Sequence, residues 1–87
     1  MKAIITVVGK DKSGIIACVT ERLAQKKVNI ADISQTVLGD WFAMIMLVET
    51  GDALIGELRE DMRALGEKVG LDISVQHEDI FTAMHRV

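Results

Sequence analysis

The fold is decided by the stretch Gly9-Lys10-Asp11-Lys12-Ser13-Gly14-Ile15-Ile16 and by its continuation at Val28-Asn29-Ile30-Ala31-Asp32-Ile33. In the first segment, two glycines bracket a turn that opens a helix. Between the two segments, apolar residues recur at helical spacing up to Lys27, and the second segment then begins a strand with Asn29. A first strand that stops at Gly9, a helix and a returning strand therefore form the first half of the predicted fold.

Changes of hydrophobic period predict six elements along the chain. Strands are expected at residues 2–8, 29–38, 41–50 and 71–78, and helices at residues 14–27 and after Gly51-Asp52 up to Gly70. Ser13 is expected to cap the first helix, and Gly39-Asp40 to form a hairpin turn with Gly39 at positive φ. The order βαββαβ predicts an α+β, ferredoxin-like sandwich, with two helices on one face of an antiparallel sheet of order 4-1-3-2.

The first and third predicted strands are apolar on both faces, although the two helices of this fold cover only one. We therefore expect a homo-oligomer, with a dimer as its simplest form, in which another copy covers the second face. The alternative is that the C-terminal tail, residues 79–87, folds over this face. That tail has apolar residues at helical spacing and is expected to form a short amphipathic helix that docks on its own sheet or on a partner's.

Composition limits the possible functions of the chain. Its 87 residues are expected to form one domain, residues 1–87. The net charge of −3 argues against nucleic acid or an anionic membrane as partner, since both need a basic surface. The single Cys18 is compatible with a reducing compartment, and no signal peptide or spanning segment is evident, so a cytoplasmic location is expected. Aromatic residues are rare, which predicts an aliphatic, methionine-filled core with Trp41 partly exposed.

The turn that opens the first helix has the chemistry of a small-ligand site. The first N–H groups of a helix lack intrahelical partners and carry the positive end of its dipole, so a carboxylate can bind there. Gly9 and Gly14 would let the backbone approach such a ligand, and Lys10 and Lys12 add positive charge. The turn lacks the spacing of a phosphate-binding P-loop or a dinucleotide fingerprint. Alternatively, Asp11 and Ser13 form local turns that only initiate the helix.

The pattern Gly9-x-Asp11-x-x-Gly14-Ile15-Ile16 followed by Lys27-Val28-Asn29-Ile30-Ala31-Asp32-Ile33 resembles the signature of ACT domains, regulatory modules that bind amino acids. The closing residues 76–86 resemble those of small standalone ACT proteins. The resemblance implies a ligand held between two copies, by Asp11, Gly14, Ile15 and Ile16 of one and by Asn29 and Ile30 of the other. Some members have a polar side chain at the position of Gly9 and an amide at that of Asp11. An acid at 11 is better suited to an ammonium group.

Three classes of function follow from these observations. The first is a non-catalytic regulatory module that senses an amino acid at a dimer interface and acts in trans on a separate, unidentified protein partner. The second is a ligand-free module for oligomerisation or protein interaction. The third is an enzyme, because acylphosphatases share this topology, but their phosphate loop uses an arginine that this loop lacks. No catalytic residue, cofactor or metal site is expected: Cys18 fits a core position, and His77 and His85 fit surface or packing positions better than a metal pair.

Overall fold

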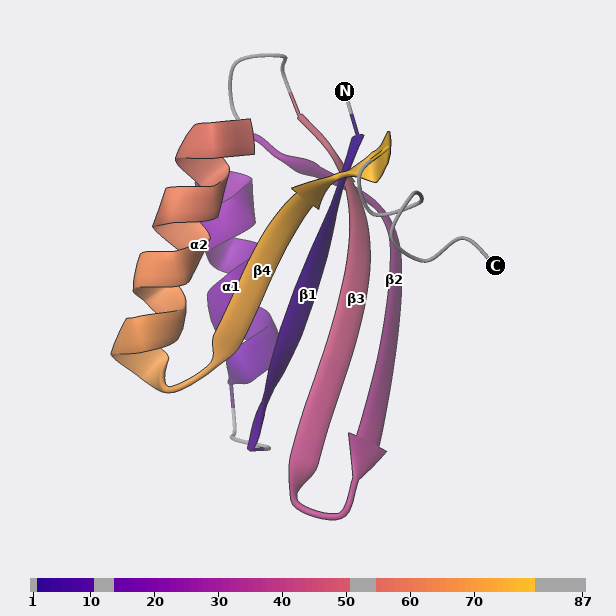
Figure 1. The fold of residues 1–87 in the computed structure, drawn as a ribbon, viewed down its shortest axis with the longest axis vertical. Coiled ribbons are helices and arrows are strands. Elements are labelled where there is room, and N and C mark those ends of the chain that lie inside the picture. The colour runs from indigo at the N-terminus through magenta and orange to yellow at the C-terminus, as the bar shows by residue number, and fades with distance from the viewer. Residues whose placement is uncertain (1, 11–13, 51–54, 80–87) are drawn as a thin grey trace.

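The computed structural model describes residues 2–10, 14–50 and 55–79. The elements follow in the order β1 (Lys2–Lys10), α1 (Ile15–Gln25), β2 (Asn29–Leu38), β3 (Trp41–Glu49), α2 (Ile55–Val69) and β4 (Asp72–His77). The four strands form an antiparallel sheet of order β2-β3-β1-β4; in the view of Figure 1, α2 lies beside β4 and α1 lies behind it. The predicted ferredoxin-like βαββαβ fold is confirmed, since this order is 4-1-3-2 in reverse.

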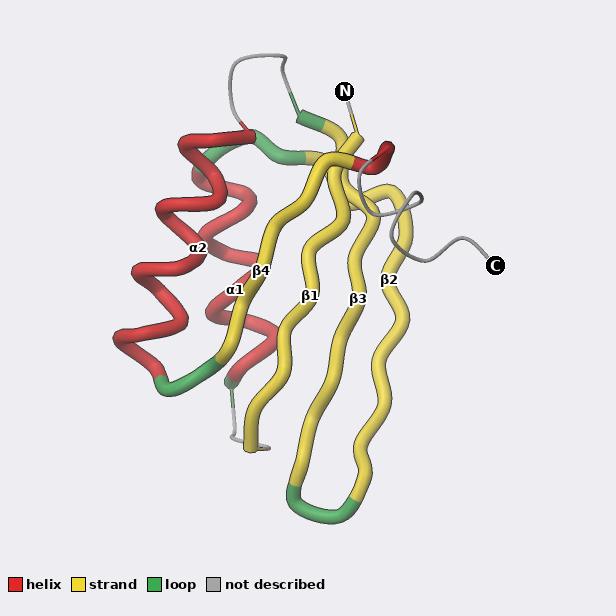
Figure 2. The backbone as a smooth tube through the Cα atoms, viewed as in Figure 1, coloured by secondary structure: helices red, strands yellow, loops and turns green. Residues whose placement is uncertain are grey.

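The strands β2 and β3 form a long hairpin that extends beyond the end of β1 (Figure 2). Leu38 pairs with Trp41, so the turn has two residues, and Gly39 has the predicted positive φ, 61°. A left-handed residue at the first turn position suits the twist of a hairpin. The prediction that the first strand stops at Gly9 is wrong: Gly9 and Lys10 pair with Phe42 and Trp41, because the hairpin provides a partner that far along the sheet.

The core lies between the sheet and the helices. Alternate side chains of β1 and β3 are buried on the helix side, where they meet one face of each helix. The residues concerned are Ala3, Ile5, Val7, Phe42, Met44, Met46, Val48, Ile15, Val19, Leu23, Leu58, Met62 and Leu65. The core is aliphatic and rich in methionine, as predicted. Between the helices, Arg22 pairs with Asp61 at 2.8 Å, both side chains being partly exposed. In the described part of the chain neither helix is long and apolar enough to cross a bilayer.

The start of α1 differs from the prediction. Its N-cap is Gly14, which has a left-handed φ of 84°, and no side-chain hydrogen bond caps the helix there. The prediction that Ser13 occupies the N-cap is therefore wrong, because the left-handed glycine moves the first helical residue to Ile15. A residue other than glycine at 14 would be strained, although a Cβ there would meet no other atom within 4 Å.

The end of α1 fixes where β2 begins. Lys27 has a left-handed φ of 58°, Lys27 N–H donates to Ala24 O at 3.0 Å, and Val28 N–H donates to Leu23 O at 3.0 Å. These two bonds are those of a Schellman motif, and the buried side chains of Val28 and Leu23 provide its apolar contact. The motif turns the chain sharply into β2, so that Asn29 starts the edge strand.

Replacing Lys27 with glycine is expected to stabilise the protein, because glycine adopts the left-handed conformation without the Cβ penalty of lysine. We expect the free energy of unfolding to rise by about 0.5 to 1 kcal/mol, measured by urea denaturation. The exposed Lys68 inside α2 provides the control, since the same substitution there should lower stability by about 1 kcal/mol. A loss of stability at both positions would contradict this account of the motif.

Candidate ligand site at the first turn of α1

The first turn of α1 has main-chain N–H groups that find no partner within the helix. The first intrahelical bond runs from Cys18 N–H to Gly14 O at 2.9 Å, so the N–H groups of the preceding helical residues have no partner within the helix. Gly14 is exposed, Ile16 is 37% exposed, and Ile15 is buried in the core, where it anchors the turn. The described part of the site is thus a helix start with an exposed glycine, held to the core by Ile15. Asp11, Lys12 and Ser13 lie outside the described residues.

Close packing, and not the approach of a ligand, explains why residue 9 is a glycine. A Cβ at this position would lie 2.6 Å from Leu71 Cδ2 and 3.5 Å from the main-chain oxygen of Gly70. Gly9 is buried in β1, so this contact belongs to the junction between β1 and the chain that leads into β4. The sequence pattern suggests that both Gly9 and Gly14 let a ligand approach the backbone. Of the two, only Gly14 borders open space.

Asn29 and Ile30 lie at the other end of α1. The helix has 11 residues and is therefore about 16 Å long. Figure 1 shows the chain entering α1 at the end of the molecule where β1 stops and starting β2 at the opposite end. One copy therefore brings Gly14, Ile15 and Ile16 together, and separately Asn29 with Ile30, but it does not join the two groups.

The start of β2 displays Asn29 to solvent and holds Ile30 in place. Asn29 is exposed opposite Glu49, while Ile30 is partly buried and packs against the core. A register shift follows between Ile30 and Asp32, which leaves one extra residue on β2. Such bulges re-aim the side chains on either side of them. The Asn29 amide, with one acceptor and two donors, is available to a molecule that approaches this edge.

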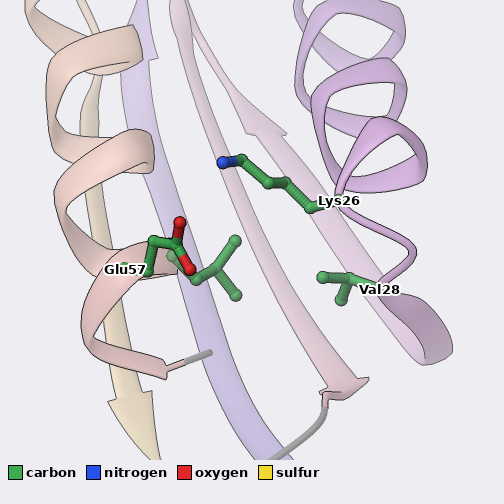
Figure 3. Close-up of a pocket in the computed structure, with 4 residues that line it drawn as sticks. Lys26, Val28 and Glu57 are labelled. Carbon is green, nitrogen blue, oxygen red and sulfur yellow. The ribbon is translucent and has the colours of Figure 1, made fainter. Parts of the chain in front are cut away.

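A small recess lies at the Asn29 end, between the end of α1 and the start of α2 (Figure 3). It is lined by Lys26, Val28, Glu57 and Leu58, opens to solvent and has room for about one water molecule. Lys26 and Glu57 thus place an ammonium and a carboxylate on either side of an apolar floor. Sequence reasoning missed this juxtaposition, since Lys26 fits the negative end of a helix dipole and Glu57 fits a solvated face. No local sequence signal could have shown this, because Lys26 and Glu57 become neighbours only through tertiary packing.

Packing and local hydrogen bonding account for the surroundings of two further candidates, Cys18 and His77. Cys18 is half-buried against the core, as predicted. His77 Nδ1 accepts a hydrogen bond from Asp79 N–H at 3.1 Å, and His85 lies outside the described residues. Among residues 2–10, 14–50 and 55–79, no three His, Cys, Asp or Glu side chains gather as metal ligands. The predicted tail helix falls almost entirely on residues that the structure does not describe.

Known proteins resemble this chain in both sequence and fold. The family model described as "ACT domain" matches residues 2–76. A UPF0237 protein from Methanopyrus kandleri is 51% identical over 88 residues, which cover 99% of this chain and 98% of the relative. The solved ACT domain protein from Streptococcus pneumoniae is 48% identical, with a TM-score of 0.80 and 93% of each chain covered. The ligand-free regulatory subunit of aspartate kinase from Thermus thermophilus is 25% identical, with a TM-score of 0.70, and the match covers 86% of this chain and 50% of that subunit.

The family model that matches residues 2–76 places this sheet with two helices in a class of small regulatory domains that bind small molecules. The chain belongs to the ACT-domain family, and within it to the UPF0237 group. ACT domains are regulatory modules, and the resemblance seen in the sequence is confirmed.

Proposed function

We propose that this protein is a cytoplasmic, non-catalytic regulatory module that binds an amino acid between two copies of the chain and acts in trans on a separate protein. The observation that carries the proposal is the separation of two groups of polar donors along α1. The N–H groups of Ile15 and Ile16, which have no partner within the helix, stand at one end, and the Asn29 amide stands at the other. An antiparallel pair of copies would bring one group against the other twice, once at each end.

The chemistry of the two groups suits the two ends of an amino acid. The ligand carboxylate would accept hydrogen bonds from the first turn of α1, where the helix dipole favours negative charge. The ligand ammonium would be bound by Asp11 and by the Asn29 side-chain oxygen of the partner copy. Charge-assisted hydrogen bonds of this kind are stronger than neutral ones, so a small ligand can bind with useful affinity.

The sheet edges favour one way of pairing. In the described part of the chain, β4 has its outer edge partly covered, because Arg59 Nε donates to Val75 O at 3.0 Å. On the opposite edge, β2 pairs only with β3 among the described strands, and nearly all its residues are exposed. An uncovered strand edge is a template for another strand. Antiparallel pairing of β2 with β2 of a second copy would place Asn29 of that copy beside the hairpin tip, at the Gly14 end.

Exposed apolar side chains on the helix side of β2 support the same pairing. Ile33 and Val37 are 42% and 57% exposed, although they point to the face that the helices cover elsewhere. Ile16 is exposed on the side of α1 that faces away from α2, since Cys18 and Arg22 occupy the α2 side. A second copy along β2 would bury these three residues around the proposed ligand.

Thermal unfolding in the presence of each of the twenty amino acids tests ligand binding. A ligand at one hundred times its dissociation constant should stabilise the folded protein by about 2.7 kcal/mol, which raises Tm by roughly 15 °C in a domain of this size. One amino acid or a related group is expected to give this shift, and isothermal titration should give one ligand per chain. Absence of any shift at millimolar concentrations, with no heat of binding, would contradict the proposal.

Action in trans is expected because this one regulatory domain spans 98% of the length of the relative from Methanopyrus kandleri. The similar protein from Thermus thermophilus is described as a regulatory subunit of aspartate kinase, so a domain of this fold can belong to a regulatory subunit. By thermodynamic linkage, the ligand and the protein partner must alter each other's affinity by the same factor. A partner captured equally well with and without amino acid would favour the alternative, a ligand-free interaction module.

A further inference from the structure

The helix side of β2, from Ile33 to Val37, is here called the ledge. β2 lies at one edge of the sheet, whereas α2 packs against β4 at the other edge. Ile33 pairs with Met46, and Val37 pairs with Phe42. Both partners are buried under the helices, so Ile33 and Val37 point to the helix side as well. They are nevertheless 42% and 57% exposed, so the fold of one copy leaves the ledge open.

The flank of α1 beside the ledge is also apolar at its start. Ile16 is 37% exposed and lies on the side of α1 away from α2, which is the side toward the β2 edge. One helical turn later, the hydroxyl of Thr20 donates to Ile16 O at 2.7 Å. Because a hydroxyl has only one proton, Thr20 cannot also donate to a molecule on the ledge. Such a molecule would meet hydrocarbon from both β2 and α1.

The ledge itself carries no charge. Between Ile33 and Val37, the same side of β2 presents Gln35, which is neutral and exposed. The acidic residue nearest in the sequence is Asp32, which lies on the opposite face of the sheet, where it pairs with Leu47. Its Oδ1 accepts a hydrogen bond from Ile33 N–H at 2.8 Å. Among the described residues, this stretch of β2 therefore offers a ligand one amide and no ion partner.

The ledge begins at the end of the molecule where the proposed ligand site lies. Val37 is in the same row of the sheet as Gly9, near the end of β1 at which the chain enters α1 (Figure 1). Ile33 lies four residues before Val37, about 13 Å along the strand. The proposed pairing brings residue 29 of one copy beside the hairpin tip of the other, so its two-fold axis passes near residue 33. Ile33 of both copies would close the inner end of each site.

We propose that the amino acid bound by this module has an apolar side chain, and that Ile16, Ile33 and Val37 determine this preference. The inference rests on the proposed function, in which the first turn of α1 and the second copy bind the ligand's carboxylate and ammonium. The ligand's side chain then extends over the ledge and leaves water together with these three residues. A charged side chain would lose its hydration there without an ion partner, and a hydroxyl would lose hydrogen bonds to water.

Isothermal titration with amino acids of nearly equal size tests the inference. Valine and threonine, leucine and asparagine, and methionine and glutamine form pairs that differ mainly in polarity. In each pair that binds, the apolar member is expected to bind more tightly. Valine should exceed threonine by about 10- to 100-fold, the discrimination that an apolar pocket achieves against an added hydroxyl. Aspartate, glutamate, lysine and arginine should give no heat of binding.

Val37→Thr assigns the preference to the ledge, because it keeps the size of residue 37 and adds a hydroxyl. The ratio of valine affinity to threonine affinity should fall by about 10-fold. Thr36→Val makes the reverse exchange on the opposite face of β2 and is the matched control, with an unchanged ratio. Residues 36 and 37 are both exposed, so both variants should fold, which circular dichroism checks. A ratio within one variant is insensitive to how tightly its copies pair, because both ligands need the same pair.

Tighter binding of the polar member of the pairs would overturn the inference, and its loss in Gln35→Met would assign the selectivity to the Gln35 amide instead. An equal ratio in Val37→Thr and the unaltered chain would also overturn it. Both results would leave the proposed function intact, since an amino acid binds in each. Absence of binding by all twenty amino acids would overturn the proposed function, and this inference with it.

Discussion

Replacing Gly66 with alanine is expected to lower the free energy of unfolding by about 2 kcal/mol, although alanine is the better helix former. A Cβ at this position of α2 would lie 2.5 Å from the main-chain oxygen of Leu71. That atom cannot move aside easily, because it belongs to the turn held by hydrogen bonds from Gly70 N–H and Leu71 N–H to Gly66 O. For a domain of 87 residues the loss corresponds to a fall in Tm of roughly 10 °C.

Gly56 provides the matched control in the same helix. A Cβ at Gly56 would meet no other atom within 4 Å, so the same substitution adds only helix propensity. Gly56→Ala is expected to raise the free energy of unfolding by about 0.5 to 1 kcal/mol. Urea denaturation of both variants measures the two effects. Equal effects of the same sign would show that the close approach of α2 to the chain before β4 is not what requires glycine at 66.

The second large effect is expected at the proposed ligand site. Asn29→Ala removes a side chain that would bind the ligand from the partner copy, so affinity should fall by about 10- to 100-fold, the value of a hydrogen bond to a charged group. Ile16→Glu places a carboxylate beside the ligand's own carboxylate and should abolish binding. Both side chains are exposed in one copy, so both variants should fold. Gln25→Ala removes an exposed amide elsewhere on α1 and should leave affinity unchanged; an equal loss for all three variants would contradict the assignment.

Much of the fold could be predicted because local signals agree with the final structure. The hairpin follows from Gly39, whose positive φ suits a two-residue turn, and the end of α2 follows from Gly70, which has a φ of 78°. The apolar character of both faces of β1 and β3 is also visible in the sequence. The predictions that failed concern boundaries. Ser13 is a good capping residue, but the conformation of Gly14 places the N-cap one residue later.

The candidate site could be predicted less completely, because some of its features depend on the local sequence and others on the tertiary fold. The helix start at Gly14 and the strand start at Asn29 are readable from the sequence. Their separation by the length of α1 is a property of the fold, as is the contact of Gly9 with Leu71 that gives this glycine a packing role. The sequence also cannot show that the first turn of α1 lies on the helix side of the sheet. A copy that covered the opposite face could not bring its Asn29 to Gly14, so the proposed ligand site needs a copy along β2.

The most direct test of the central claim mixes two variants that each lack one half of the proposed site. In a dimer of Asn29→Ala with Ile16→Glu, one site would combine the intact helix start of the first chain with the intact Asn29 of the second, and the other site would carry both defects. After subunit exchange of equal amounts, isothermal titration should therefore recover about one quarter of the wild-type sites at wild-type affinity, although neither variant alone has a site of wild-type affinity. Recovery of no sites from the mixture, or wild-type binding by either variant alone, would contradict a ligand site shared between two copies.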